Sequence, residues 1–148
     1  MSAPATPAEL ALQASCVRWL GRGLLLRGPP GTGKSDLLAR LLEAGGDLLA
    51  DDLVRLAVRD RRLVARPVAH VGLLELRGQG LVRLAALGEQ PIDLLVDCRA
   101  RAAARLPETR PERLLGVDLP RLVLACREAS ALARLRLALL AEPVGAGP

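Results

Sequence analysis

The stretch GPPGTGKS, residues 28–35, matches the phosphate-binding loop pattern G-x-x-x-x-G-K-[ST]. The apolar run LLLR, residues 24–27, precedes it, and the leucine-rich segment DLLARLLEAGG, residues 36–46, follows it. In the second segment the leucines recur at helical spacing, and the closing pair of glycines is a typical helix stop. The sequence therefore predicts a strand, a phosphate-binding loop and a helix in direct succession.

The residue types in this loop suit the binding of a nucleoside triphosphate. Gly31 and Gly33 allow the backbone to approach phosphate oxygens with its N–H groups turned inward. The helix that begins near Lys34 directs the positive end of its dipole at the same anion. We expect Lys34 to reach the β- and γ-phosphates and the Ser35 hydroxyl to ligate Mg²⁺. The predicted nucleotide-binding residues are Gly28, Pro29, Pro30, Gly31, Thr32, Gly33, Lys34 and Ser35.

Acidic residues beyond the loop are the candidates for metal binding and base catalysis. Asp51 and Asp52 end the predicted strand DLLADD, on the side of the sheet where the phosphates would lie. A carboxylate there can accept the proton of an attacking hydroxyl or hold a metal-bound water; a solvated strand end is the alternative. Glu75 lies in the largely apolar stretch LLELRGQG and needs an arginine or a metal as its partner. Asp97 resembles a Walker B acid, although we favour a plain polar strand end there.

The remaining segments predict an α/β fold with a mixed sheet, because hairpins interrupt the middle of the chain. Strands are predicted at residues 15–20, 24–27, 47–52, 53–58, 63–66, 91–97 and 121–125, and a closing helix at residues 127–142. Residues 99–118 are arginine-rich and predicted to form a loop with a short helix. With no repeat and no linker, we predict one P-loop domain over residues 1–148, with loose tails at residues 1–9 and 143–148.

The composition disfavours several classes of function. The net charge is +5, but the arginines are dispersed and Trp19 is the sole aromatic residue, so we predict no nucleic-acid binding. Cys16, Cys98 and Cys126 lie in or beside apolar runs and form no C-x-x-C pair, which indicates buried reduced thiols. His70 has no second histidine to form a metal site and is read as a loop residue. Without a signal peptide or membrane span, we expect a cytoplasmic protein.

Three segments together resemble the catalytic domain of HPr kinase/phosphorylase in a short, single-domain form. They are GPPGTGKSDLLARLLEAGGDLLADDLVRL, ARPVAHVGLLELRGQGLVRL and DLPRLVLACREASALARL, and the resemblance covers about residues 11–140. The loop alone would not be specific. The acidic pair that begins sixteen residues beyond Ser35, followed by LELRGQG at the family's E-[IV]-R-G-x-G signature, makes the resemblance specific.

The resemblance implies a P-loop kinase fold similar to the nucleotide-binding part of phosphoenolpyruvate carboxykinases. It implies transfer of the ATP γ-phosphoryl group to a serine of HPr, a phosphocarrier of the phosphotransferase system. By the same resemblance Asp51 would be the base toward the serine hydroxyl, with Asp52 supporting it. Lys34 would bind the β- and γ-phosphates, while Ser35 and Glu75 would hold Mg²⁺. Longer members assemble as hexamers, which makes a homo-oligomer an expectation here.

Arg77 matches the signature arginine, and by the resemblance it would stabilise charge near the acceptor or order the glycine turn. In three other places the sequence departs from the family. Gln13 stands where longer members place a catalytic histidine, and we expect no counterpart of their N-terminal domain. The arginine-bearing P-x-x-P-G-R segment, linked to the reverse reaction, is not recognisable in PRLVLACREAS, although Arg127 is nearby. We therefore predict a serine kinase with weak or absent phosphorylase activity.

Other functions remain open at the level of the sequence. A nucleotide-binding regulatory or sensor protein without transfer would also keep the loop, and Gln13 favours that alternative. A P-loop ATPase of the AAA+ type has a similar loop, but such a module normally needs a strand ending in Asp-Glu, whereas Cys98 follows Asp97 here. A kinase of the same build with a different acceptor is the third alternative.

Overall fold

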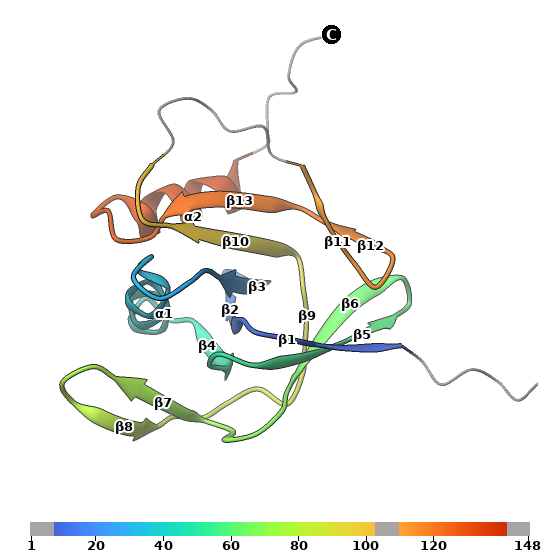
Figure 1. Ribbon diagram of the computed structural model, residues 1–148, viewed down its shortest axis with the longest axis horizontal. Helices are drawn as coiled ribbons and strands as arrows, with labels where there is room; N and C mark the ends of the chain where they lie inside the picture. Colours follow the sequence, from blue (N-terminus) through green and yellow to red (C-terminus); the bar gives the residue numbers. More distant parts are fainter. Residues whose placement is uncertain (1–7, 103–109, 142–148) are drawn as a thin grey trace, which may run out of the picture.

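The computed structural model describes residues 8–102 and 110–141. At its centre is a five-stranded sheet with the order β13-β10-β3-β2-β4 (Figure 1). The strands of this sheet are β2 (Ser15–Trp19), β3 (Arg22–Arg27), β4 (Asp47–Ala50), β10 (Leu94–Arg99) and β13 (Arg121–Ala125). β10 pairs in parallel with β3 and β13, whereas β2 is antiparallel to β3 and β4. The sheet is mixed, which confirms the predicted α/β class.

The strand directions decide where the connecting segments meet. Because β4 is antiparallel to β2, it runs in the same direction as β3, β10 and β13. The carboxyl ends of these strands therefore lie at one edge of the sheet, together with the amino end of β2. The loop at residues 28–33 follows β3, and Asp51 follows β4. Ligands of open α/β sheets bind at such an edge.

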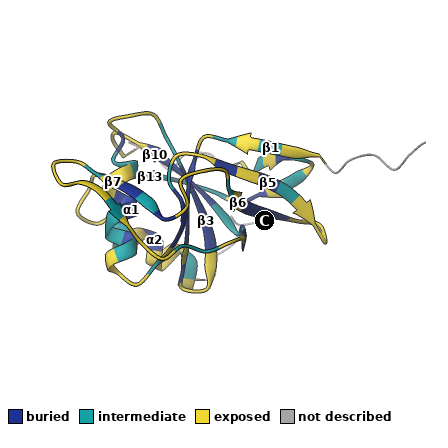
Figure 2. Cartoon of the chain, turned by 90° about the horizontal axis from the view of Figure 1, so that it is seen from below, coloured by how far each residue is buried: buried dark blue, intermediate teal, exposed yellow. Residues whose placement is uncertain are grey.

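The two faces of the central sheet are covered by different layers. The helices α1 (Lys34–Glu43) and α2 (Ala131–Leu140) pack on one face, and a second sheet of order β1-β5-β6-β9 packs on the other. The strands of the second sheet are β1 (Glu9–Leu12), β5 (Val54–Arg59), β6 (Arg62–Pro67) and β9 (Gln90–Pro91). Figure 2 shows buried residues along β3, in the middle of the molecule. In β3, Leu24 and Leu26 pack in the helix-side core, whereas Leu25 packs between the sheets. This alternation explains the continuous apolar run before the loop.

Two small hairpins complete the fold. They are formed by β7 (Leu73–Leu76) with β8 (Gly80–Arg83), and by β11 (Glu112–Leu114) with β12 (Val117–Leu119). The first lies apart from both larger sheets in Figure 1. The second replaces the loop and short helix predicted in this region. Leu114 and Leu119 are buried in the core between the sheets, and Gly116 has a positive φ of 78° that suits the tight turn.

Several predicted boundaries were wrong. Glu9 lies in β1, paired with Ala57 of β5, and not in a loose tail. The strand predicted at residues 47–52 ends at Ala50, and the strand predicted at residues 91–97 is divided between β9 and β10. The closing helix begins at Ala131, after turns at residues 126–130. The other expected tail, residues 143–148, lies outside the described residues, as do residues 103–109 of the predicted loop.

Cys16, Cys98 and Cys126 are buried free thiols, as the sequence predicts. His70 lies exposed in a turn, also as expected. In the part of the chain that the structure describes, the helices have ten residues each, and neither is long and apolar enough to cross a membrane.

The start of β3 packs closely against β9, the short strand before β10. A substitution at Gly23 therefore tests this packing. A Cβ at Gly23 would overlap the carbonyl oxygen of Pro91. We expect Gly23→Ala to lower the free energy of unfolding by about 1–3 kcal/mol, because backbone must shift to admit the methyl group. Gly88→Ala is the matched control, since a Cβ at Gly88 has open space around it. Urea denaturation of both variants measures the difference, and equal stabilities would contradict the packing described here.

Candidate functional site

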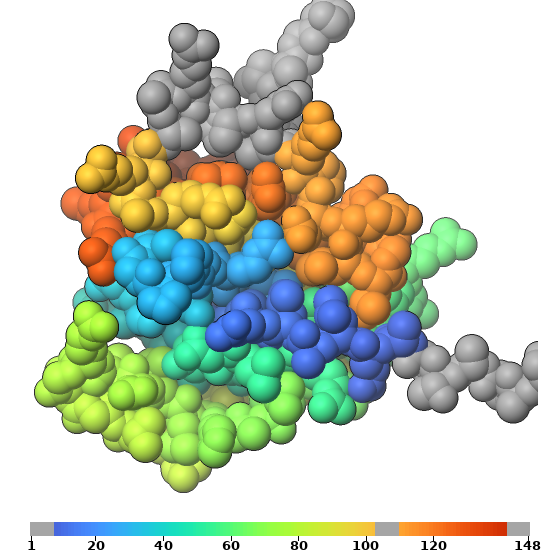
Figure 3. All heavy atoms as spheres, in the orientation of Figure 1, coloured from blue at the N-terminus to red at the C-terminus, as the bar shows by residue number. Residues whose placement is uncertain are grey.

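A cleft of about 1430 Å³ opens at the sheet edge where the strand ends meet (Figure 3). It is bounded by the loop after β3, the segment after β4 and the β7–β8 hairpin. The residues predicted from the sequence that line it are Gly28, Pro29, Pro30, Gly31, Gly33, Lys34, Ser35, Asp51, Asp52, Glu75 and Arg77. Thr32 is buried beneath the loop surface, where its Oγ1 donates to the carbonyl oxygen of Pro29 at 2.8 Å. This hydrogen bond between two residues of the loop stabilises its conformation.

The loop needs glycine where the sequence provides it. Gly31 and Gly33 both have φ of 88°, in the left-handed region, and Gly33 is the N-cap of α1. A Cβ at Gly33 would also come within 2.6 Å of Arg127 Cγ and 2.9 Å of the Cys126 carbonyl carbon. The loop is thus pressed against the turn after β13, which leaves its other side open to the cleft.

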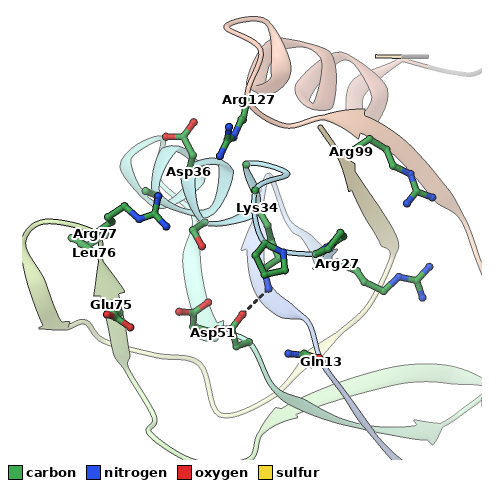
Figure 4. Close-up of a pocket in the computed structure, with 18 of the residues that line it drawn as sticks. Gln13, Arg27, Lys34, Asp36, Asp51, Glu75, Leu76, Arg77, Arg99 and Arg127 are labelled. Carbon is green, nitrogen blue, oxygen red and sulfur yellow. Dashed lines mark hydrogen bonds and ion pairs between the residues drawn. The ribbon is translucent and has the colours of Figure 1, made fainter. Parts of the chain in front are cut away.

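Lys34 is held inside the cleft by an ion pair. Its Nζ lies 2.6 Å from Asp52 Oδ1, with the Lys34 side chain 13% exposed and the Asp52 side chain 65% exposed (Figure 4). Asp52 has a φ of 66°, an uncommon left-handed conformation for a residue other than glycine. A phosphate bound by the loop would compete with Asp52 for this ammonium group.

Asp51 is fixed by a buried serine. The Ser15 hydroxyl donates to Asp51 Oδ1 at 2.8 Å and accepts a hydrogen bond from the Asp52 backbone N–H at 3.2 Å. Partial burial raises the pKa of the Asp51 carboxyl above its ordinary value, and the nearby charges of Asp52 and Glu75 add to the increase. The hydrogen bond from Ser15 and the charge of Lys34 oppose it. A carboxyl group with a raised pKa is better suited to accept a proton near neutral pH.

The oxygen donors of the cleft fit a hard cation that is shared with phosphate. The carboxylates of Asp51, Asp52 and Glu75 and the Ser35 hydroxyl line the same space. Within residues 8–102 and 110–141, no group of three or more His, Cys, Asp or Glu side chains is placed to hold a metal ion by itself. Mg²⁺ usually takes only one or two protein carboxylates together with substrate phosphates and water. Burial is the main cause of the raised pKa of Asp51; a bound cation would relieve the smaller contribution that comes from repulsion by Asp52 and Glu75.

Glu75 and Arg77 reach the cleft from the β7–β8 hairpin, across from Asp51 (Figure 4). Both side chains are exposed. Arg77 lies in the turn between β7 and β8, flanked by Gly78 and Gly80, which both have positive φ. The hairpin is thus a separate element that brings one acidic and one basic group to the site.

Sequence reasoning missed the basic side of the cleft. Arg27, Arg99, Arg121 and Arg127 all line it. Asp97, with 5% of its side chain exposed, pairs with Arg99 at 2.9 Å and lies 3.7 Å from both Arg27 and Arg121. Asp97 is therefore not a free Walker B-type acid; it is a polar residue near the end of β10, as favoured from the sequence, and it is buried in ion pairs with arginines. Their positions in the sequence could have revealed them, because Arg27 and Arg99 end predicted strands and Arg127 follows the last one, and these strands meet at this edge.

Gln13 lies at the mouth of the same cleft, on the side of Asp51 (Figure 4). Its side chain is exposed and it precedes β2, the strand that carries Ser15. An amide can orient a bound group by hydrogen bonds but cannot exchange a proton near neutral pH.

Comparisons with known proteins agree on one family. The family described as HPr Serine kinase C-terminal domain matches residues 6–135. The HPr kinase/phosphorylase of Geobacillus thermodenitrificans is 31% identical over 121 residues, which is 72% of this chain and 39% of that protein. The HPr kinase/phosphorylase of Clostridium perfringens is 36% identical over 80 residues, 53% of this chain and 26% of that protein. The chain thus spans well under half the length of these curated relatives.

A solved structure is similar in fold. The structure of the Hpr(Ser) kinase/phosphatase from Coxiella burnetii superposes with a TM-score of 0.75 at 19% sequence identity. The similarity covers 88% of both chains. It supports the mixed α/β architecture described here.

The raised pKa of Asp51 predicts a pH-dependent stability difference for Asp51→Asn. When the pKa of an acid is higher in the folded than in the unfolded protein, the folded protein loses stability as the pH rises. The loss begins near the unfolded-state pKa, about 3.9 for Asp, and is complete above the folded-state pKa. The variant lacks this loss, so we expect it to be more stable than wild type at pH 7. The two proteins should converge at the acidic end of the range. Thermal melts between pH 4 and pH 8 measure the difference, and a wild type that is the more stable protein at pH 7 would contradict the assignment.

Proposed function

The chain belongs to the HPr serine kinase C-terminal domain family, and on this premise we propose that it transfers the γ-phosphoryl group of ATP to a serine of an HPr-type phosphocarrier protein. The observation that carries the proposal is the position of Asp51. This carboxylate, oriented by Ser15, lines the same cleft as the phosphate-binding loop and Lys34. A phosphate-binding loop and a positioned base at one site are what a kinase of a hydroxyl acceptor requires.

The triphosphate would lie along residues 28–35. Backbone N–H groups of the loop and the amino end of α1 would bind the phosphate oxygens, as they do at other helix termini. Lys34 would exchange its partner Asp52 for the β- and γ-phosphates. This exchange is favourable because a phosphate carries more charge than a single carboxylate.

Ser35 and Glu75 would hold Mg²⁺, which when bound neutralises charge on the phosphates. Ser35 is the residue of the loop pattern that ligates this ion, and Glu75 is an exposed carboxylate that faces the loop across the cleft. The two side chains come from α1 and from the β7–β8 hairpin, so metal binding would tie the hairpin to the rest of the site.

The acceptor serine would enter between Asp51 and the loop. Asp51 would take the proton of its hydroxyl, and Asp52 would support the carboxylate by holding Lys34 nearby until phosphate binds. Arg77, on the hairpin, would stabilise charge on the acceptor side. The fixed charges of the cleft would supply most of the rate acceleration, because they need no reorganisation during transfer.

An ATP-binding sensor without transfer is the second candidate, and Gln13 favours it. The family places a histidine at this position, and the Gln13 amide cannot carry or release a proton near neutral pH. In this case the loop and Lys34 would bind ATP without passing its phosphoryl group to a serine.

The first test is phosphorylation of the host's own HPr-type phosphocarrier. The protein is incubated with ATP, Mg²⁺ and the phosphocarrier, and intact mass reports the added phosphate. We expect wild type to add one phosphate and Asp51→Asn to be slower by about 10²–10⁴-fold, the usual contribution of a general base. Asp118→Asn is the matched control, because Asp118 is exposed on β12 and absent from the cleft.

Calorimetric titration of ATP accompanies the transfer assay. Asp51→Asn should bind ATP as wild type does, because the loop and not Asp51 holds the phosphates. Bound ATP without transfer by wild type would favour the sensor. Transfer by Asp51→Asn at the wild-type rate would remove Asp51 from the role of base.

The reverse reaction is expected to be weak. No arginine corresponds to the family segment linked to phosphorolysis, and the nearest candidate, Arg127, packs against Gly33. Phosphoserine-HPr incubated with inorganic phosphate should therefore release pyrophosphate much more slowly than the forward reaction consumes ATP. Rapid pyrophosphate release, measured by a coupled assay, would contradict this expectation.

A further inference from the structure

We propose that Ser15 is the positioning residue for the Asp51 carboxylate, an inference that rests on the proposed function because Asp51 is the base there. Ser15 begins β2 and has no exposed surface. It is not among the residues that line the cleft. Ser15 therefore cannot touch a nucleotide or an acceptor, and it acts on the reaction only through the acidic pair.

One hydroxyl group fixes both the side chain and the backbone of this pair. The hydroxyl proton goes to Asp51 Oδ1, because the contact with the Asp52 N–H uses an oxygen lone pair. Among the described residues no other side chain donates a hydrogen bond to Asp51. The second oxygen, Oδ2, is thereby left to accept the acceptor proton, and its direction is set by the bond at Oδ1.

The local backbone explains why a side chain is needed here. The last register pair between β2 and β4 at this edge is Cys16 with Ala50, and the register is irregular directly after Cys16. Bulged ladders redirect side chains and end regular pairing. Asp52 then takes a left-handed conformation. The Ser15 hydroxyl continues the connection between the strands where the backbone ladder stops, and so holds the turn that carries Asp51 and Asp52.

A double-mutant cycle distinguishes positioning from a general structural effect. We expect Ser15→Ala to lower kcat for transfer to the phosphocarrier by about 10–100-fold, because a small displacement of a catalytic group costs on this scale. The KM and Kd for ATP should stay within about twofold, since the loop holds the nucleotide. In the Asp51→Asn background, Ser15→Ala should cost nothing further, because the group that it orients is gone. The proposal would be overturned if Ser15→Ala lowered kcat by the same factor in wild type and in Asp51→Asn. It would also be overturned if Ser15→Ala alone left kcat unchanged.

Two further variants separate the hydroxyl from its surroundings. Ser15→Thr keeps the hydroxyl and should retain most of the wild-type kcat, whereas Ser130→Ala, at the exposed start of α2, should be unaffected. The added methyl group of Ser15→Thr can disturb the packing, which a lowered melting temperature would reveal. In that case the double-mutant cycle still decides whether Ser15 acts through Asp51.

Amide exchange tests the hydrogen bond without relying on transfer. In the nucleotide-free protein the Asp52 N–H should exchange faster in Ser15→Ala than in wild type, because its acceptor is lost. Unchanged exchange would overturn the role of Ser15 even if the proposed function holds. A wild type that transfers no phosphate, with faster exchange in Ser15→Ala, would instead count against the proposed function and leave Ser15 as the residue that positions the acidic pair.

Discussion

The burial of β3 on both of its faces is the constraint on which the rest of the structure depends. Leu24, Leu25 and Leu26 have no exposed surface, because the helices cover one side of the strand and the second sheet covers the other. Full burial of each leucine is worth about 1.5–3 kcal/mol, so the strand cannot shift without a large loss. The loop that follows is thereby fixed, and α1 is fixed with it through Leu37 and Leu41 in the same core.

The cleft at the end of β3 is divided by charge. Asp51 and Asp52, which follow β4, and Glu75 of β7 line one side of it. Four arginines line the other: Arg27 and Arg99 end β3 and β10, Arg121 begins β13, and Arg127 follows it. Lys34 and Asp52 form an ion pair at the boundary. Asp97 and Glu112 hold Arg27, Arg99 and Arg121 in place, with Arg27 Nη1 3.0 Å from Glu112 Oε1. Such a division would suit the proposed binding of a polyanion beside a proton acceptor.

The local patterns of the sequence translated well into structure. The loop pattern, the leucine spacing after it and the glycine stop correctly placed β3, the loop and α1. The hairpin of β5 and β6 also followed from its pattern. The wrong predictions concern segments whose structure depends on tertiary contacts. Glu9, predicted in a loose tail, belongs to β1 because β1 pairs with β5. Part of the arginine-rich segment, predicted as a loop with a short helix, forms the β11–β12 hairpin because Leu114 and Leu119 are buried between the sheets.

The sequence by itself determined the glycine-rich loop at residues 28–33, its flanking strand and helix, and the residue types available for chemistry, because these depend on periodicity and turn preferences within about ten positions. Only the tertiary structure decided which of those residues meet. Ser15 reaches Asp51 across 36 positions, and Arg27 reaches Glu112 across 85. Contacts at such separations depend on strand order and direction, which bring the carboxyl ends of β3, β4, β10 and β13 and the amino end of β2 to one edge. No local pattern in the chain encodes that arrangement.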